Sequence, residues 1–321
     1  MSYKYCIIGF GISGQLLLLE LLKANVSKKD IVICDETFLG GDLVTKYGSV
    51  LSNTPWWKTK KALEIYTNEL PDISPDICTP VRTIAITCLQ IALKAAEGID
   101  RHTTKVNSLE PSWIINHTFG TFKSEKVFLT IGGQEKNVEL PLSKIPLSIA
   151  LDKYQLANCL VPNDKITVFG TSHSGVVVLD NLNSLGISTT AVYKGTLPFL
   201  FESETYGGLK EQSALSAKEI LDGKYSNTIL VSWSDPIAIY RTLIKSTKII
   251  IATGFEGKST FGKDYTLYNP ETAVINIGSN IYGFGMAYPG ITKIAERTYQ
   301  DISVLSFQEQ IQRCLPAILS P

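Results

Sequence analysis

Residues 5–14 read Tyr-Cys-Ile-Ile-Gly-Phe-Gly-Ile-Ser-Gly, a short apolar run that leads into three glycines at the spacing G-x-G-x-x-G. The apolar run predicts a buried strand, and the Leu-rich segment 15–24 predicts a helix after it. A second apolar run, residues 31–34, then ends at Asp35. This order of strand, glycine-rich turn, helix and strand predicts a βαβ unit of a parallel sheet.

The glycine-rich turn is typical of a dinucleotide site. Gly9, Gly11 and Gly14 permit a tight turn and let backbone N–H groups approach a pyrophosphate at the helix N-terminus. Asp35 stands 21 positions after Gly14, close to the ~20 expected of a carboxylate that binds ribose hydroxyls. Glu36 points the other way in an extended strand. The alternative is a glycine-rich turn that binds nothing.

The same order of elements returns at residue 165. A strand (166–169), a turn (170–175) and a helix (176–185) lead to a further strand that ends before Lys194. We interpret this as an internal duplication of the βαβ unit. It predicts an α/β fold with two Rossmann-like dinucleotide-binding domains.

The second turn differs from the first in two ways. Gly170 and Gly175 remain, but Ser172 takes the place of the middle glycine, and Ser174 offers another hydroxyl to a phosphate. Lys194 stands 19 positions after Gly175, where the first unit has an acid. Because a cation there suits a 2′-phosphate, we expect NADPH rather than NADH. The alternative is a solvated lysine at a strand end.

The composition describes a globular protein with no net charge. Of 321 residues, 44% are hydrophobic and 19% are charged, and 30 Lys and Arg balance 30 Asp and Glu. Such a chain is not drawn to nucleic acid or anionic lipid, so we expect neither as a partner. No apolar stretch approaches the ~20 residues that span a bilayer, and no signal-peptide pattern follows Met1. These observations predict a cytoplasmic protein.

Metal binding and dithiol chemistry have little support in the sequence. No two cysteines are spaced as Cys-x-x-Cys, and the three histidines are scattered, so we predict no metal site. We expect reduced, structural thiols. The alternative is a redox pair that Cys78 or Cys88 forms with a distant cysteine. The six cysteines are Cys6, Cys34, Cys78, Cys88, Cys159 and Cys314.

The motifs resemble those of flavoproteins with two dinucleotide-binding domains. That family includes thioredoxin-reductase-like enzymes and the flavin-containing and N-hydroxylating monooxygenases, and it binds FAD at the first glycine-rich turn. A Gly-Gly pair follows the ribose acid, as Gly40-Gly41 does here, and the segment 52–55 resembles one that passes near the flavin. Later segments, 130–133, 252–255 and 281–286, resemble the strand ends that complete the two domains.

The resemblance implies a discontinuous FAD-binding domain, residues 1–150 and 248–321, with an NAD(P)-binding domain, residues 151–247, inserted into it. The expected cofactors are FAD and NADPH. The cofactor-binding residues predicted by the motifs and the resemblance together are Gly9, Gly11, Ser13, Gly14, Asp35, Glu36, Gly41, Asn53, Thr54, Gly132, Gly170, Ser172, Ser174, Gly175, Lys194, Gly254, Gly285 and Met286.

The sequence departs from the family pattern at two positions and lacks one motif of thioredoxin reductase. Met286 stands where many members have an Asp, a departure that monooxygenase relatives share. Leu18 replaces a small residue, so the helix must pack differently on its sheet. The redox Cys-x-x-Cys of thioredoxin reductase is missing, which excludes disulfide reduction by that mechanism.

The resemblance implies an FAD-dependent oxidoreductase that takes hydride from NAD(P)H and passes electrons to oxygen or a small-molecule acceptor, with monooxygenase activity as one form. The alternatives are a flavin reductase without disulfide chemistry and an inactive nucleotide-binding or scaffold protein of the same fold. The sequence predicts no catalytic side chain. It leaves the oligomeric state undecided, with a homodimer as one option. Trp56 and Trp57 either stack near the flavin or pack as core or interface aromatics.

Overall fold

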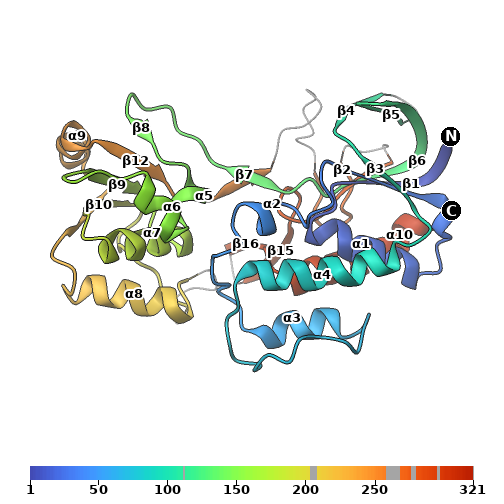
Figure 1. Cartoon of the computed structure of the whole chain (residues 1–321), viewed down its shortest axis with the longest axis horizontal. Helices are drawn as coiled ribbons and strands as arrows, with labels where there is room; N and C mark the ends of the chain where they lie inside the picture. Colours follow the sequence, from blue (N-terminus) through green and yellow to red (C-terminus); the bar gives the residue numbers. More distant parts are fainter. Residues whose placement is uncertain (111–112, 203–207, 258–267, 276–279, 295–296, 321) are drawn as a thin grey trace. The chain divides into compact units, whose positions relative to one another are not determined.

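The computed structural model describes the chain except residues 111–112, 203–207, 258–267, 276–279, 295–296 and 321 (Figure 1). The chain forms two compact units. Unit 1 contains residues 1–48, 54–134 and 257–321, and unit 2 contains residues 49–53 and 135–256. The second unit is inserted into the first, as the sequence predicts.

Unit 1 is built on a largely parallel sheet of order β3-β2-β1-β6-β5-β4, in which β14 also pairs with β6. The central strand, β1, lies parallel to β2 and β6, and β5 and β4 continue the sheet as antiparallel strands. The strand bounds are β1 (Ser2–Ile8), β2 (Ile31–Asp35), β3 (Asp100–Thr103), β4 (Val106–Glu110), β5 (Ile114–His117), β6 (Gly120–Leu129) and β14 (Ile281–Gly283).

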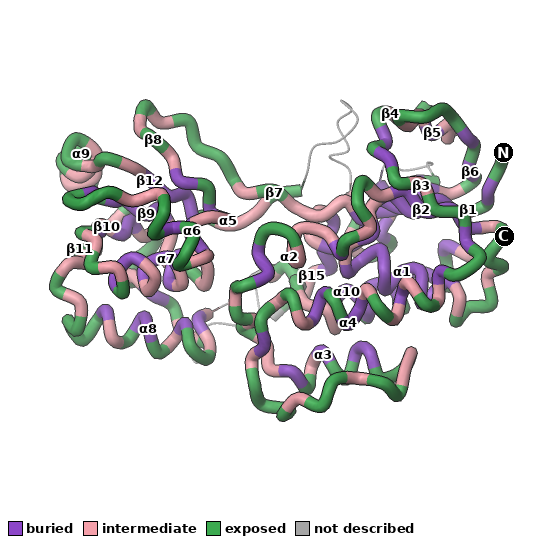
Figure 2. The backbone as a smooth tube through the Cα atoms, viewed as in Figure 1, coloured by how far each residue is buried: buried purple, intermediate pink, exposed green. Residues whose placement is uncertain are grey.

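The helix α1 (Ile12–Lys23) is the centre of the unit 1 core, and Figure 2 shows most of it as buried. It packs against α4 and α10 as well as the sheet. Leu18 is fully buried with its neighbours, since a helix that is apolar on all sides belongs in an interior. The other elements of this unit are the 3₁₀ helix η1 (Lys28–Asp30), α2 (Asp42–Thr45), α3 (Trp56–Leu63), α4 (Val81–Ala95), α10 (Val304–Leu319) and the hairpin strands β15 (Gly290–Ile294) and β16 (Arg297–Asp301).

Unit 2 holds a fully parallel sheet of order β11-β10-β9-β12-β8. Its strands are β8 (Ser143–Lys144), β9 (Lys165–Phe169), β10 (Ser188–Tyr193), β11 (Thr228–Ser232) and β12 (Lys248–Ile251). Its helices are α5 (Leu147–Ala150), α6 (Lys153–Asn158), α7 (His173–Ser184), α8 (Glu211–Leu221) and α9 (Pro236–Lys245). Two short strands, β7 (Gly133–Glu135) and β13 (Phe255–Gly257), pair where the chain passes from one unit to the other.

The bounds of the two units differ from those of the predicted domains. The strand β12, expected in the first domain, pairs with β9 through the register Lys248↔Ile166 to Ile251↔Phe169 and so belongs to unit 2. Residues 135–150 also belong there. The carboxylate of Glu135 accepts hydrogen bonds from the backbone N–H groups of Leu147 (3.0 Å) and Ser148 (2.8 Å) at the start of α5.

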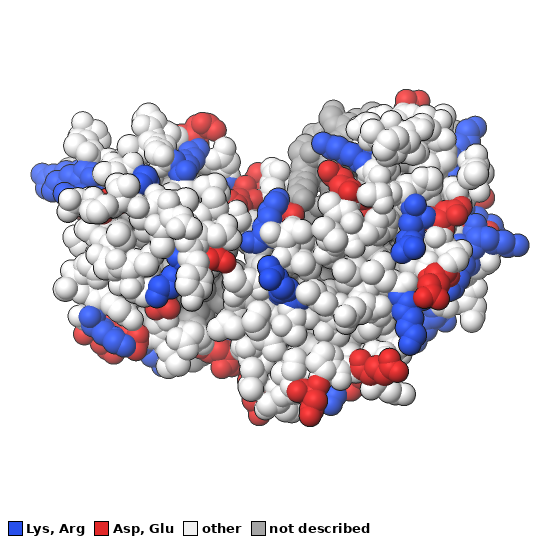
Figure 3. Space-filling view, viewed as in Figure 1, with Lys and Arg blue, Asp and Glu red and all other residues white. Residues whose placement is uncertain are grey.

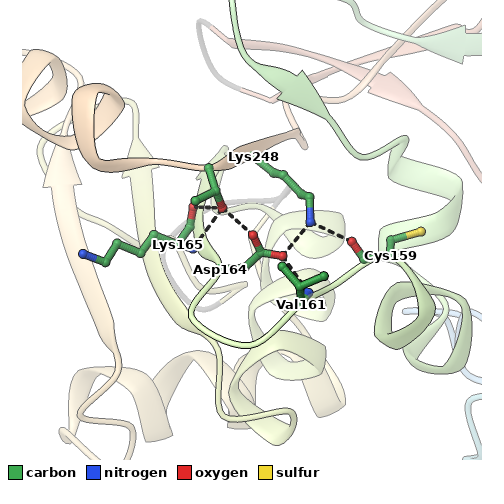
Figure 4. A network of polar contacts seen from close by, with 6 residues as sticks. Cys159, Val161, Asp164, Lys165 and Lys248 are labelled. Carbon is green, nitrogen blue, oxygen red and sulfur yellow. Dashed lines mark hydrogen bonds and ion pairs between the residues drawn. The ribbon is translucent and has the colours of Figure 1, made fainter.

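A buried ion pair fixes the amino ends of β9 and β12 in unit 2 (Figure 4). Lys248 Nζ lies 2.6 Å from Asp164 Oδ2, and only 3% of the Asp164 side chain is exposed. Thr247 Oγ1 donates to the other oxygen of the carboxylate, at 2.7 Å, and Val161 N–H donates to Oδ2, at 2.8 Å. Lys248 also donates to the Cys159 carbonyl. The network lies at the end of the sheet opposite the glycine-rich turn.

Charges of both signs are interspersed on the face of the molecule drawn in Figure 3, with uncharged surface between them. That distribution agrees with the equal numbers of acidic and basic residues. Among the helices that the structure describes, none combines the length and the apolarity that a membrane crossing needs.

Candidate functional site

Two glycines of the first turn are required by close backbone approach. Gly9 has a φ of +97°, and its N–H donates to the carbonyl of Cys34 at 2.8 Å. A Cβ on Gly9 would lie 2.6 Å from the carbonyl oxygen of Thr130, and a Cβ on Gly14 would overlap the carbonyl oxygen of Gly9. These glycines let the first turn of α1 fold back against the end of β1.

Gly11 has a different role, because a Cβ built there would meet nothing within 4 Å. It is the N-cap residue of α1 and, as a glycine, has no side chain that could cap the first turn of that helix. The first N–H groups of a helix lack intrahelical partners and carry a partial positive charge. The open space beside Gly11 therefore has the position and polarity that an anion requires.

Two other segments of unit 1 reach the same helix end. Gly41, with φ +72°, would place a Cβ 3.3 Å from the Cα of Gly11. Gly285, with φ +88°, comes so close that a Cβ would overlap the hydroxyl of Ser13. Gly285 begins a turn that Tyr288 N–H closes at 3.0 Å, and Met286 is half-buried within it. Glycines from three parts of the sequence thus converge on α1.

Asp35 anchors this arrangement. Its Oδ2 accepts the N–H of Phe10 at 2.7 Å, and its Oδ1 accepts the N–H groups of Thr37 at 2.9 Å and Phe38 at 2.7 Å. A carboxylate offers about four acceptor positions, so Oδ2 retains capacity for a ribose hydroxyl. Glu36 is exposed and lies just beyond the end of β2 rather than in the strand, so the alternation of an extended strand does not place its side chain.

Two further residues hold the first turn and were missed in the sequence. Thr130 Oγ1 lies 2.6 Å from the Gly9 carbonyl oxygen, to which it donates. Gln15 is fully buried, and its Nε2 donates to the Phe10 carbonyl at 2.7 Å. The signal for Thr130 in the sequence was that it begins the segment 130–133, which resembles a strand end of the flavoprotein family. Gly132 itself has φ +73° with open space around its Cβ position.

The segment predicted to pass near a flavin divides between the two units. Residues 49–53, including Asn53, belong to unit 2, whereas Thr54 belongs to unit 1. Ser49 hydrogen-bonds to the Asp152 carboxylate, and Leu51 accepts a hydrogen bond from the His173 ring. A flavin contact by Asn53 stays a prediction.

Of the two tryptophans that follow, Trp56 is a core residue. It is only 1% exposed and packs in the main hydrophobic cluster of unit 1. Trp57 is 42% exposed, and the ammonium of Lys58 lies 5.4 Å from the centre of one of its rings. The structure therefore favours the core interpretation for Trp56.

The turn in unit 2 repeats the backbone geometry of the first. Gly170 has a φ of +105°, and its N–H donates to the Val192 carbonyl at 2.9 Å. A Cβ on Gly170 would overlap the Ala252 carbonyl oxygen, and one on Gly175 would overlap the Gly170 carbonyl oxygen. The same two glycine positions are needed for the same steric reason. The duplication seen in the sequence is therefore a duplication of the turn.

The serine in the middle of the second turn is compatible with an open helix end. Ser172 is the exposed N-cap residue of α7, and its side chain does not cap the helix. Ser174 is half-buried in the first turn. His173 lies between them, and burial lowers its pKa, which favours the neutral imidazole. Its Nδ1 is buried without a hydrogen-bond partner among the described residues.

The remaining predicted residues of unit 2 lie at the same edge of its sheet. Lys194 directly follows β10 and is exposed. Gly254, with φ +99°, follows β12, and a Cβ there would meet open space. Since β9, β10 and β12 are parallel neighbours, their carboxyl ends bring the glycine-rich turn, Lys194 and Gly254 to one edge.

No disulfide forms among the residues that the structure describes. Burial raises the pKa of Cys88 to about 12. Burial and a hydrogen bond with Cys34 raise the pKa of Cys6 well above its usual value. The sequence did not reveal that these two thiols meet across β1 and β2. Because the thiolate is the reactive form, buried thiols of this kind suit a structural role. In addition, the described residues contain no group of three or more His, Cys, Asp and Glu side chains placed to hold a metal ion.

No protein-family model and no curated protein sequence matches the chain. Several solved structures do. A bacillithiol disulfide reductase from Staphylococcus aureus superposes with a TM-score of 0.66 at 11% identity, over 99% of this chain and 98% of that protein. A flavin monooxygenase from Stenotrophomonas maltophilia gives a TM-score of 0.66 at 14% identity, over 99% and 98% of the two chains. NADH:rubredoxin oxidoreductase from Clostridium acetobutylicum gives 0.55 at 17% identity, over 100% of this chain and 76% of that one.

These structural neighbours are flavoprotein oxidoreductases of one architecture. The chain has their fold, with two Rossmann-like dinucleotide-binding domains, the second inserted into the first. The family resemblance read from the glycine-rich turns is confirmed at the level of the fold. Sequence identities this low leave the chemistry to be argued from the sites themselves.

Proposed function

We propose that this protein is an FAD-dependent oxidoreductase that takes hydride from NADPH and passes the electrons to oxygen or a small-molecule acceptor. The observation that carries the proposal is the open, uncapped N-terminus of α1 at Gly11, with Gly41 and Gly285 packed around it. A second glycine-rich turn of the same geometry in unit 2 supports a second nucleotide.

The residues of unit 1 fit the adenosine and pyrophosphate parts of FAD. The N–H groups at Gly11 and in the first turn of α1 would hold the pyrophosphate, because a first turn leaves its N–H groups without intrahelical partners and the space beside Gly11 is open. Asp35 Oδ2 would accept a hydrogen bond from a hydroxyl of the adenosine ribose. The turn at Gly285 and Met286 would cover the phosphates from the other side. Backbone N–H groups would donate to the pyrophosphate in this arrangement, so its binding does not depend on the side chain at position 286.

The residues of unit 2 fit a nicotinamide dinucleotide phosphate. The first turn of α7, after Ser172, would hold its pyrophosphate, and the Ser174 hydroxyl would add a donor. Lys194 would supply the positive charge that a 2′-phosphate requires and that a 2′-hydroxyl does not. NADPH is accordingly the donor that we propose.

Bound flavin would supply the two-electron redox chemistry, and the protein would bind, orient and shield it. Four of the six thiols are buried and do not suit an internal electron acceptor, those of Cys6, Cys34, Cys88 and Cys314. Although several structural neighbours are named disulfide reductases, we propose a diffusible acceptor or oxygen for this chain. Monooxygenase activity is the finer form of the proposal, and one neighbour bears that name.

The proposal is tested by the visible absorption spectrum of the purified protein, followed by anaerobic addition of NADPH. We expect the absorption bands of oxidised flavin, release of FAD on denaturation, and bleaching of the bands by NADPH. In air, oxidation of NADPH with and without candidate amines, with measurement of hydrogen peroxide and hydroxylated product, separates a monooxygenase from a simple flavin reductase. Protein that binds no flavin after incubation with FAD would refute the proposal. Protein that binds FAD without turnover would support the scaffold alternative.

A further inference from the structure

Trp233 is an exposed aromatic residue in a fixed position at the carboxyl edge of the unit 2 sheet. It directly follows β11, and 56% of its surface is exposed. Its N–H donates to the carbonyl of Tyr193, the last residue of β10, at 2.8 Å. Its ring meets Phe169, the last residue of β9, edge to face, with centroids 6.1 Å apart. The contact with Phe169 and the backbone hydrogen bond thus hold the residue, while 56% of its surface stays exposed.

The backbone around Trp233 is a turn that keeps the ring in place. Asp235 N–H donates to the Ser232 carbonyl at 3.0 Å and closes the turn. The Asp235 carboxylate accepts the N–H of Ala238 at 2.9 Å and so caps α9. The hydroxyls of Ser232 and Ser234 hydrogen-bond to each other at 2.8 Å. In the β10–β11 register, Ser232 pairs with Tyr193, next to Lys194.

The strand order gives a direction to any dinucleotide on this edge. The glycine-rich turn follows β9, Lys194 follows β10, and Trp233 follows β11, and these three strands are parallel neighbours. Neighbouring strands lie about 4.8 Å apart. A nucleotide with its pyrophosphate at α7 and its ribose beside Lys194 therefore extends its base over the end of β11.

We propose that Trp233 is the surface on which the adenine of the nicotinamide dinucleotide stacks, and that it sets the affinity of unit 2 for adenine nucleotides. Lys194 then recognises the 2′-phosphate, with the Ser232–Ser234 hydroxyl pair beside it. This inference rests on the proposed function for the presence of a nucleotide in unit 2. It assigns base binding and phosphate recognition to two different residues, so the two contributions are separable.

The test is calorimetric titration of the FAD-loaded protein with 2′,5′-ADP and with 5′-AMP. Neither ligand carries a nicotinamide, so binding is measured without flavin reduction. We expect the parent protein to bind 2′,5′-ADP at least tenfold more tightly than 5′-AMP. Trp233→Ala should lower the affinity for both ligands about tenfold or more, because the adenine base loses its stacking partner. Trp233→Phe should restore part of that loss.

Lys194→Ala should lower the affinity for 2′,5′-ADP alone and bring it close to the affinity for 5′-AMP. Tyr240→Ala is the matched control, since Tyr240 is an exposed aromatic residue of the neighbouring helix α9, 66% exposed against 56% for Trp233, and we expect this substitution to change neither affinity. A fluorescence readout is independent of stability: 2′,5′-ADP should quench the parent's tryptophan emission, and this quenching should be lost in Trp233→Phe.

Two negative outcomes have different meanings. If the parent binds both ligands and Trp233→Ala binds them equally well, the role of Trp233 is overturned and the proposed function stands. If the parent binds neither ligand, this inference falls together with the proposed hydride donor, whereas FAD binding is judged separately by the absorption spectrum.

Discussion

Gly11 and Gly14 are three positions apart in one turn, yet a side chain added at each meets different surroundings. A Cβ at Gly14 overlaps the Gly9 carbonyl oxygen, whereas a Cβ at Gly11 enters open space. We expect Gly11→Val to change the free energy of unfolding by no more than ~1 kcal/mol and to weaken FAD binding at least tenfold. Absorption spectra of the variant after dialysis with FAD, and urea unfolding, measure the two effects.

Gly14→Ala provides the contrast to Gly11→Val. It should destabilise the apoprotein by roughly 1–3 kcal/mol, because the backbone of the turn must shift. Retention of flavin by a folded Gly11→Val variant at the parent's affinity would show that the space beside Gly11 is not a phosphate site.

Asp35 is the second residue whose local contacts define an experiment. Its two oxygens accept three backbone N–H groups, and an asparagine amide would place a donor against at least one of them. We expect Asp35→Asn to lower the free energy of unfolding by roughly 1–3 kcal/mol and to weaken FAD binding. Glu36→Gln, at the exposed neighbouring position, should change stability by less than ~0.5 kcal/mol. Equal effects of the two substitutions in urea unfolding would contradict the anchoring role of Asp35.

At the scale of elements, the fold of unit 1 brings together two histidines from strands that are not paired, His102 of β3 and His117 of β5. His102 and His117 have ring centroids 5.2 Å apart and both pack against Phe122. Burial, and to a lesser extent His102, lowers the pKa of His117. The folded state therefore favours neutral His117.

The sign of the resulting pH dependence follows from that lowered pKa. The stability contributed by neutral His117 is fully present above its unfolded-state pKa of about 6.5 and is lost as the pH falls toward and through its folded-state pKa. We expect the parent to lose more stability between pH 8 and pH 5 than the variant His117→Gln does. Parallel losses in the two proteins, measured by thermal unfolding, would argue against this titration.

The ion pair between β12 and the turn before β9 makes a separate prediction for unit 2. Asp164 is buried against Lys248 Nζ at 2.6 Å, so Lys248→Met leaves a buried carboxylate without its cation. Removal of one partner of such a pair costs about 3–5 kcal/mol. We expect the free energy of unfolding to fall by about that amount, and the double variant Lys248→Met with Asp164→Asn to recover part of it. A Lys248→Met variant as stable as the parent in urea would show the pair to be dispensable.

At the scale of the whole molecule, the fold was largely predictable because it depends on local patterns. The turns at Gly9 and Gly170 follow apolar strands and precede helices, and a repeated local signal of this kind specifies a parallel sheet. The Leu-rich segment that became α1 and the apolar run that became β9 needed no distant information.

What the sequence could not supply depended on contacts between distant segments. The pairing of β12 with β9 rather than with unit 1, the approach of Gly285 to Ser13, and the support of Gly9 by Thr130 each join residues that are far apart in the chain. Trp233 likewise could not be singled out from the sequence, where it lies in a serine-rich turn; its position is defined by contacts with Tyr193 and Phe169 at the ends of other strands. The role that we propose for Trp233 could therefore be inferred only from the three-dimensional structure.

The insertion of unit 2 has a consequence for biosynthesis. A ribosome releases residues 135–256, and with them every strand of the unit 2 sheet, before it releases β14 and α10. Unit 1 at that moment has β1, β2, β6 and α4 but lacks β14, which pairs with β6, and α10, which packs on α1 beside α4. The inserted unit can therefore complete its sheet on the nascent chain while the unit encoded first is still unfinished. The side of α1 on which α10 packs would then stay uncovered until the last helix of the chain has emerged.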